Sequence, residues 1–351
     1  ENMSRRKTME LKVGNVEIGG DNPISVQSMT NTDTRDIKST INQIIALEKA
    51  KCDIVRVAIP DIEAAKAIRE IKKETTIPII GDIQFDYRLA IESVDNGIDG
   101  LSINPGNIGS IRRVKEVVKA CQERNIPIRI GVNSGSISKR ALEKYDGVNE
   151  NSMVYSALEH IKILEDMNYT NIKISLKATS VPLTIKSYLK MAEYVDYPFH
   201  LGITEAGPIW NGTVKSSVGI GALLAMGVGD TIRVSLTGDP VEEVRVGREI
   251  LKSLNLLEDG IQIISCPTCG RTQINLVQLV EEVQSRLAHV DKPIKLAIMG
   301  CAVNGPGEAR EADIGIAGGN GCGLIFKKGK IIKKVSEEKL IDELVKEVEN
   351  I

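Results

Sequence analysis

Histidine, aromatic residues and long apolar runs are all scarce in this 351-residue chain. With only three histidines, a catalytic zinc held by histidines is not expected. Aromatic residues make up 3% of the chain, and the net charge is -2, so neither base stacking nor phosphate attraction favours a nucleic-acid partner. No apolar run reaches the roughly 18 residues of a membrane-spanning helix, and the first residues show no signal pattern. We therefore expect a soluble, cytoplasmic protein without a membrane partner.

The rest of the composition is that of an ordinary globular protein. Hydrophobic residues make up 42% and charged residues 26%, and the length allows two domains. Six cysteines in a cytoplasmic chain indicate metal ligands, catalytic groups or core residues before they indicate disulfides. Cys52 and Cys121 are expected to fill core positions, whereas the other four cysteines lie after residue 260.

Short β-branched runs alternate eight times with amphipathic helical stretches before about residue 255. The expected strands span residues 25–29, 54–59, 77–83, 100–104, 127–133, 171–178, 198–204 and 231–237. Strands that are separated by helical crossovers pair in parallel, and eight such units match a closed barrel better than an open sheet. The sequence therefore predicts an α/β fold with an N-terminal (β/α)8 TIM barrel over residues 1–256, which we expect to bind the substrate.

After residue 256 the pattern changes to a smaller α/β unit, residues 257–351. We expect strands at 261–266, 294–300 and 313–317, a helix at 274–287, a hairpin turning at 328–330 and a closing helix at 337–348.

Cations interrupt several barrel strands that should be apolar: Arg56, Arg129, Lys173, Lys177 and Arg233. Because side chains alternate along a strand and the apolar neighbours need the helix-facing side, the cations should point into the barrel. A buried cation is unfavourable unless it meets a carboxylate or an anionic ligand. Pairing with Asp82, Asp86 and Glu205 is one interpretation. The favoured one is a phosphate-rich substrate at the carboxyl ends of the strands, where barrel enzymes bind their substrates.

A second group of candidates lies near the end of the chain. Cys266 and Cys269 form a C-x-x-C pair, which redox dithiols, zinc sites and iron-sulfur sites share. Cys301 follows the next strand, and Glu308 comes after an Asn-Gly-Pro-Gly turn. Three thiolates and one oxygen ligand suit an iron-sulfur cluster, because an oxygen-held iron can exchange that ligand for substrate. Structural zinc, with Cys322 as the fourth ligand, and a dithiol remain alternatives.

Several ordered segments resemble one family, the 4-hydroxy-3-methylbut-2-enyl diphosphate synthases in their bacterial two-domain form. The matching segments are residues 54–57, 85–90, 103–109, 130–136, 200–207, 214–216, 233–236, 266–269 and 304–309. The resemblance implies a [4Fe-4S] cluster in the second domain, held by Cys266, Cys269, Cys301 and Glu308. It also implies an iron-sulfur oxidoreductase of the methylerythritol phosphate pathway. Such an enzyme opens 2-C-methyl-D-erythritol 2,4-cyclodiphosphate with two electrons from ferredoxin or flavodoxin, and it is a homodimer whose active site lies between subunits.

The strand-end residues and the resemblance together give the expected substrate-binding set: Gln27, Ser28, Arg56, Asn104, Arg129, Asn133, Lys177, Lys215, Arg233 and Ser235. Glu205, Asp82 and His200 are the candidates for proton delivery, although a lone histidine in a strand is more often a core residue. Gln84 stands where members of this family carry histidine, and Ser102 stands where some of them carry arginine. Two rivals remain: a zinc-stabilised barrel enzyme acting on a phosphorylated substrate, and a non-catalytic iron-sulfur carrier.

Overall fold

The computed structural model describes residues 4–301, 307 and 309–351. The chain divides into two compact units, Glu1–Leu256 and Leu257–Ile351, and each is described by itself. None of the helices in the described ranges is long and apolar enough to cross a membrane.

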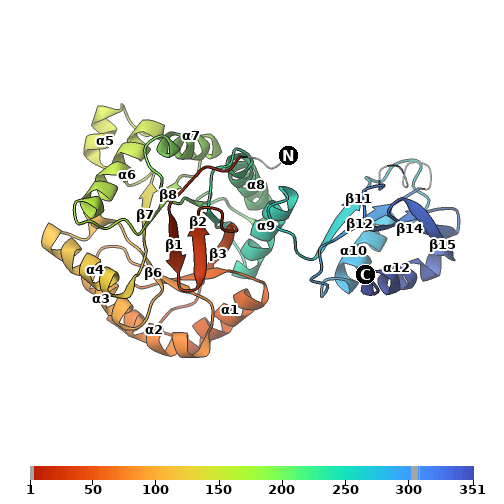
Figure 1. Cartoon of the computed structure of the whole chain (residues 1–351), viewed down its shortest axis with the longest axis horizontal. Helices are drawn as coiled ribbons and strands as arrows, with labels where there is room; N and C mark the ends of the chain where they lie inside the picture. The colour runs from red at the N-terminus through yellow and green to blue at the C-terminus, as the bar shows by residue number, and fades with distance from the viewer. Residues whose placement is uncertain (1–3, 302–306, 308) are drawn as a thin grey trace. The chain divides into compact units, whose positions relative to one another are not determined.

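The first unit is the predicted (β/α)8 barrel (Figure 1). Its eight parallel strands are β3 (Ser25–Met29), β4 (Ile54–Ala58), β5 (Ile79–Asp82), β6 (Gly100–Ser102), β7 (Ile128–Asn133), β8 (Ile172–Lys177), β9 (His200–Leu201) and β10 (Thr231–Ile232). Strand β10 pairs with both β9 and β3, and a parallel bridge between Ile174 and Phe199 joins β8 to the segment that enters β9. The sheet therefore closes on itself.

Helices surround this sheet (Figure 1). They are α1 (Ile37–Lys49), α2 (Ile62–Glu74), α3 (Tyr87–Asp95), α4 (Ile111–Arg124), α5 (Lys139–Lys144), α6 (Glu150–Glu165), α7 (Val181–Ala192), α8 (Ile209–Ala225) and α9 (Pro240–Ser253), with a 3-10 turn η1 (Pro105–Asn107). Helix α2 illustrates why they form, because the Asp61 side chain accepts the Ala64 N–H and caps its first turn. Its apolar positions, among them Ile68 and Ile71, recur at helical spacing and are fully buried.

A short hairpin that the sequence analysis did not anticipate precedes the barrel: β1 (Glu10–Val13) and β2 (Val16–Gly19). Its apolar side chains Leu11, Val13 and Ile18 pack against Ile54 and Ile80, at or near the amino ends of β4 and β5. The hairpin therefore covers the amino end of this part of the barrel.

Strands β9 and β10 are much shorter than the predicted runs 198–204 and 231–237. The backbone N–H of Arg233 still donates to Leu201 O, at 2.9 Å. Three residues later, the N–H of Leu236 donates to the Glu243 side chain instead of to a neighbouring strand, at 3.0 Å. The Glu243 side chain on α9 thus replaces the interstrand backbone hydrogen bonds at the end of β10.

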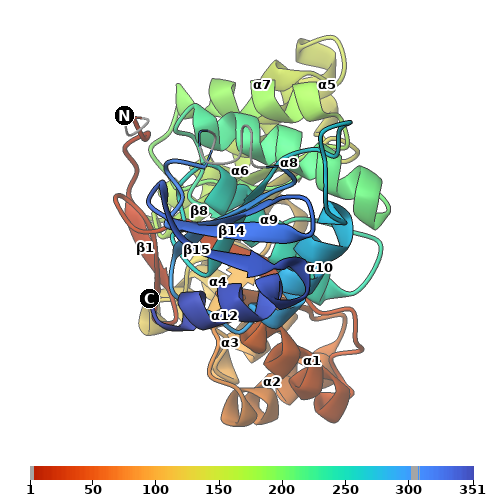
Figure 2. The same ribbon diagram turned by 90° about the vertical axis from the view of Figure 1, so that its right-hand side faces the viewer.

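The second unit is the smaller α/β domain that was predicted. Its sheet has the order β11 (Ile261–Ser265), β12 (Ile294–Met299), β13 (Ile314–Gly318), β14 (Cys322–Lys327) and β15 (Lys330–Ser336). The first three strands are parallel and the last two pair antiparallel. Helices α10 (Leu276–Arg286) and α12 (Leu340–Glu349) lie on one face of this sheet, and η2 (Glu337–Lys339) precedes α12 (Figures 1 and 2).

Candidate active site

Three cations lie fully inside the barrel without a carboxylate partner in the described part of the chain. Arg129 and Lys173 are 1% exposed and are paired in register on β7 and β8, and Arg56 on β4 is 5% exposed. One guanidinium nitrogen of each arginine (Nη1) and the Lys173 Nζ make no hydrogen bond to any residue that the structure describes. No carboxylate of the described residues forms an ion pair with any of the three. The expectation that strand cations point inward therefore agrees with the structure.

The contacts that these cations do make are to neutral groups. Arg129 donates from Nε and Nη2 to Ser102 Oγ, at 3.2 and 2.8 Å. Arg56 donates from Nε to the Met29 sulfur, at 3.3 Å. A hydroxyl or a thioether orients a guanidinium but does not neutralise it, so the positive charge is left for another partner. Ser102, noted above only as a departure from its relatives, is the residue that orients Arg129.

Arg233 differs, because a carboxylate of the protein holds it. Glu243 on α9 is 3% exposed and accepts hydrogen bonds from Arg233 (3.3 Å) and from Ser28 Oγ (2.8 Å). The sequence analysis missed Glu243. It lies on the stripe 243, 247, 250, 251 that α9 buries, and an acidic residue in a buried stripe is the signal that could have found it.

We predict that Glu243→Ala lowers the free energy of unfolding of the barrel by about 3 kcal/mol, because Arg233 and the Leu236 N–H lose their acceptor. Urea denaturation followed by circular dichroism measures this change. Glu242→Ala is the matched control, since that carboxylate pairs with the exposed Arg245 at 3.6 Å and should contribute only a few tenths of a kcal/mol. Equal losses in the two variants would contradict this role of Glu243.

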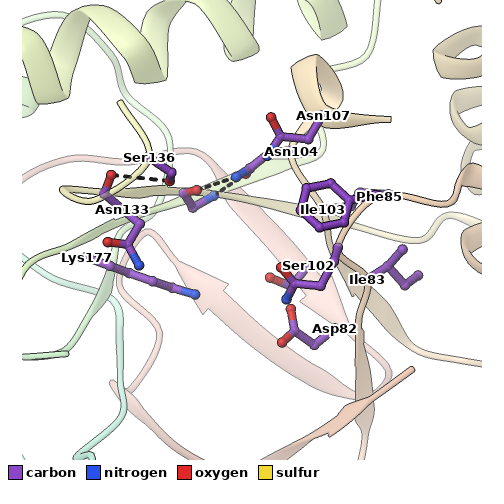
Figure 3. Close-up of a pocket in the computed structure, with 12 residues that line it drawn as sticks. Asp82, Ile83, Phe85, Ser102, Ile103, Asn104, Asn107, Asn133, Ser136 and Lys177 are labelled. Carbon is purple, nitrogen blue, oxygen red and sulfur yellow. Dashed lines mark hydrogen bonds between the residues drawn. The ribbon is translucent and has the colours of Figure 1, made fainter. Parts of the chain in front are cut away.

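A cavity of about 230 Å³ opens at the carboxyl ends of β5 to β8 (Figure 3). Its lining residues are Asp82, Ile83, Gln84, Phe85, Ser102, Ile103, Asn104, Asn107, Gly131, Asn133, Ser136 and Lys177. Figure 3 shows Lys177 and Asn133 across the cavity from Asp82 and Ser102. Arg129 contacts Ser102 at its wall, so the cavity adjoins the buried cations.

Two residues shape one wall of this cavity. Asn104 bridges to the next strand, donating from Nδ2 to Gly131 O (2.6 Å) and accepting the Gly131 N–H on Oδ1 (2.9 Å). This exchange continues the pairing of β6 and β7 beyond Ser102. A Cβ atom at Gly131 would lie 3.4 Å from Lys177 Cε and 3.0 Å from Ser175 Oγ, so the missing side chain leaves room for the lysine to cross β7.

The predicted site residues thus fall into four groups. Asp82, Asn104, Asn133 and Lys177 line the cavity. Gln27, Arg56, Arg129 and His200 are buried in the barrel interior, and both amide atoms of Gln27 lack a hydrogen-bond partner within residues 4–301, 307 and 309–351. Ser28 and Arg233 are bound to Glu243, and Ser235 is half-buried close by in sequence. Glu205 and Lys215 are exposed and do not line the cavity.

Of the three expected carboxylate partners of the cations, one is engaged elsewhere and one is exposed. Asp86 caps α3 and pairs with Arg88 at 3.0 Å. Glu205 is exposed and has a left-handed backbone with φ of 53°, a conformation that is rare for residues other than glycine. Of the three, Asp82 is the one that faces the cavity. Among the described residues, internal pairing therefore neutralises Arg233 but not the other strand cations, and it does so through a carboxylate that was not anticipated.

The crowding of cations changes the acidity of their neighbours. Arg129, followed by burial and Arg56, lowers the pKa of Lys177 to about 6. Burial, followed by Arg129 and Lys173, holds the pKa of His200 well below its ordinary value. His200 is therefore a neutral imidazole near pH 7, which makes it a poor source of a proton.

The cysteines of the second unit lie at one end of its sheet. Cys266 directly follows β11, and Cys301 comes two residues after the neighbouring parallel strand β12. The backbone N–H of Gly300 donates to Cys266 Sγ at 3.2 Å, so the two strand ends adjoin. Cys269 is exposed, and backbone and side-chain hydrogen bonds from Arg271 and Thr272 lower its pKa, which favours the thiolate.

These thiols suit an iron-sulfur cluster by their chemistry, although the described residues contain no ready-made group of metal ligands. Three thiols near one sheet edge, with an N–H donor to sulfur, are the groups that such clusters use. The predicted fourth ligand, Glu308, lies outside the described residues. Cys322 begins β14, which β13 separates from β12, so it is a less suitable fourth ligand. Burial raises the pKa of Cys52 and Cys121 to about 12, as befits inert core thiols.

Comparison with known proteins agrees with both units. Residues 8–248 match the family model for the GcpE TIM-barrel domain, and residues 262–350 match the GcpE protein C-terminal domain. A protein of Clostridium acetobutylicum named 4-hydroxy-3-methylbut-2-en-1-yl diphosphate synthase (flavodoxin) is 61% identical over 348 residues, which cover 99% of this chain and 100% of that protein. A protein of the same name from Caldanaerobacter subterraneus is 60% identical, with 98% and 97% covered.

Solved structures resemble the barrel. Dihydropteroate synthase of Yersinia pestis superposes with a TM-score of 0.52 at 10% identity, over 71% of this chain and 98% of that one. A truncated 3-deoxy-D-arabino-heptulosonate 7-phosphate synthase of Thermotoga maritima gives 0.51 at 10% identity, over 71% and 91%. Such low identity shows the fold alone. The resemblance found in the sequence is confirmed by the family models and the curated relatives: the chain belongs to the GcpE family, and its relatives from Clostridium acetobutylicum and Caldanaerobacter subterraneus are named 4-hydroxy-3-methylbut-2-en-1-yl diphosphate synthase (flavodoxin).

Proposed function

We propose that this protein reductively opens and dehydrates 2-C-methyl-D-erythritol 2,4-cyclodiphosphate to 4-hydroxy-3-methylbut-2-enyl diphosphate, a step of isoprenoid biosynthesis. The observation that carries the proposal is that relatives named for this product align with 98–99% of the chain, across both units, at 60–61% identity. Two electrons enter during the reaction. The bond from C2 to its phosphate oxygen breaks, the C3 hydroxyl leaves as water with a proton, and a double bond forms between C2 and C3.

The barrel supplies the charge that such a substrate needs. Arg56, Arg129 and Lys177 surround or adjoin the cavity without an ion-pair partner among the described residues. Guanidinium groups bind phosphate oxygens in pairs, which suits a cyclic diphosphate. Asn133 and Ser235 would add neutral donors, as would Gln27, whose buried amide has no other partner. Lys215 and Arg233 stay in the proposed substrate-binding set but contribute less to binding, because Lys215 is exposed and Arg233 is bound to Glu243.

Cys266, Cys269 and Cys301 would hold the [4Fe-4S] cluster, with Glu308 as the exchangeable fourth ligand. When bound, such a cluster supplies electrons one at a time and a Lewis-acidic iron. Flavodoxin is the favoured donor over ferredoxin, because the relatives' names state it. We place the protein in the cytoplasm, where thiols stay reduced, and as a homodimer whose two subunits together complete the active site.

Three residues remain candidates for proton delivery to the leaving hydroxyl. Asp82 faces the cavity, Glu205 is exposed beyond β9, and His200 is buried. Because burial keeps His200 uncharged through its lowered pKa, Asp82 and Glu205 are the stronger candidates.

Anaerobic turnover tests the proposal. Protein purified without oxygen, given the cyclic diphosphate and reduced flavodoxin, should convert the cyclic ³¹P NMR signals into those of a linear allylic diphosphate. Conversion should stop after exposure to air, because oxygen destroys the proposed cluster. A protein that accepts electrons from flavodoxin but leaves the diphosphate intact would be the carrier of the rival interpretation. Turnover by a zinc-loaded protein without a reductant would instead support the non-redox barrel enzyme.

A further inference from the structure

Lys177 stands among more cations than the surrounding carboxylates can neutralise. The charged or titratable groups around it are Arg129 on β7, Arg56 on β4, Asp82 on β5, His200 on β9, Arg233 after β10 and Lys173 on its own strand. Asp82 is the one carboxylate of the described cavity lining. The nearby Glu243 is already engaged by Arg233, Ser28 and the Leu236 N–H. The free barrel therefore has a surplus of positive charge at this point.

The position of the lysine makes this surplus act on it directly. Lys177 pairs in register with Asn133, and its side chain returns across β7 over Gly131, where a Cβ would lie 3.7 Å from Nζ. Figure 3 shows the amine turned toward the cavity. Arg129 approaches the same cavity through Ser102 on the neighbouring strand. The positive charges of Arg129 and Arg56 destabilise the ammonium form of Lys177, which is also partly removed from water.

We propose that Lys177 is largely uncharged in the free protein at neutral pH and takes up one proton when the diphosphate enters the cavity. The lowered pKa, about 6, agrees with the geometry. A bound dianion offsets the charges of Arg129 and Arg56, and an ammonium next to phosphate oxygens then becomes favourable. The nature of the ligand rests on the proposed function. The consequence for the reaction is that a proton enters with the substrate, in a reaction whose leaving hydroxyl needs one.

The linkage has a definite sign. Protonated Lys177 is the form that binds the anion. The affinity for the anion is therefore full below about pH 6 and is lost as the pH rises through the pKa of Lys177 in the free protein. Each phosphate of the cyclic substrate carries one ester and one anhydride bond and therefore a single strongly acidic oxygen, whose charge does not change between about pH 5 and 9. Any pH dependence in that range therefore belongs to the protein. We expect the Kd of the oxidised protein to rise about tenfold for each pH unit above about 6.5.

Calorimetry measures the number of protons that the protein takes up when the ligand binds. Titrating the cyclic diphosphate at pH 7.5 into oxidised protein, in buffers of different ionisation enthalpy, should show close to one proton taken up per bound ligand. Lys177→Arg carries a permanent charge, so it should bind without proton uptake and with a Kd that is flat in pH. Lys177→Met should bind weakly, also without uptake. Lys119→Met, an exposed lysine on α4, should behave as the unmodified protein. Undiminished uptake in Lys177→Met, or none in the unmodified protein that binds, would overturn the proposal.

A measurement without ligand separates this inference from the proposed function. In protein labelled with ¹³C-lysine, the Cε resonance that Lys177→Met removes should titrate with a midpoint near 6. A midpoint near the ordinary value of about 10.4 would refute the inference even if the cyclic diphosphate binds. Failure of the diphosphate to bind at any pH would count against the proposed function, and the NMR titration would still decide the state of Lys177.

Discussion

Replacing Arg129 by methionine is expected to lower kcat/KM for the cyclic diphosphate by about a hundred- to a thousand-fold and to leave the protein as stable as before, or more stable. Both effects have one cause. Arg129 is 1% exposed, and its contacts are to a serine hydroxyl rather than to a carboxylate. Its buried charge therefore disfavours folding, whereas a methionine of similar length fills the same space without charge. In the proposed function, this charge binds the substrate.

Two measurements check this prediction together: anaerobic turnover, and urea denaturation of the same preparation. Arg112→Met is the matched control, because Arg112 lies on the outside of α4 with 88% of its side chain exposed. It should change neither quantity. Full turnover in Arg129→Met would remove Arg129 from the binding set. A large loss of stability would mean that the guanidinium is needed for folding, against the idea of an unpaired charge held for a ligand.

Replacing Cys301 by serine is expected to abolish cluster assembly and to lower turnover at least about a thousandfold. Serine keeps the shape of the residue but supplies an alcohol that stays protonated, so it does not replace a thiolate ligand of iron. Iron content and the absorption band of the cluster measure the loss directly, before any assay. The barrel, which contains Arg129 and Lys173, should keep its structure, because Cys301 belongs to the other compact unit.

Cys322→Ser is the informative comparison for that variant. Cys322 begins β14, with β13 between it and β12, and it serves as the fourth ligand in the zinc interpretation alone. We expect it to keep its iron and its activity. Glu308→Ala should retain part of the cluster, since three thiolates remain, but should lose most activity because ligand exchange at iron is lost. Equal metal loss in Cys301→Ser and Cys322→Ser would favour a structural zinc site.

The sequence predicted the barrel because its signal is periodic and repeated. Runs rich in β-branched residues, such as 128–133 and 172–177, alternate with helical stretches. Because these helices form the crossovers between strands, the strands pair in parallel. The same alternation placed Arg129 and Lys173 on the inner face. It also brought Cys266 and Cys301 to one sheet edge, since neighbouring parallel strands end on the same side.

What the sequence analysis missed depends on contacts between distant residues. The β1–β2 hairpin has four-residue strands, and its packing against Ile54 and Ile80 is a tertiary contact that no local pattern reports. Glu243 looks like an ordinary acidic residue in the first turn of a helix, and its role appears only when Arg233 and Ser28 meet it. The crossing of Lys177 over Gly131 likewise requires two strands to be in register.

The cations of the barrel interior fit the proposed binding role better than a role in stability. Lys173 Nζ, Arg56 Nη1 and Arg129 Nη1 are buried polar atoms without a hydrogen-bond partner in the described ranges, an arrangement that a purely structural core avoids. Only where Glu243 reaches Arg233 does a carboxylate of the described chain neutralise such a cation. The pattern indicates a site built to receive several negative charges at once.

Iron and acid-labile sulfide, measured on protein purified without oxygen, test the central claim most directly. The account predicts about four of each per chain, lost together in Cys301→Ser. Stoichiometric zinc, or protein that turns over the cyclic diphosphate with neither iron nor sulfide, would contradict it.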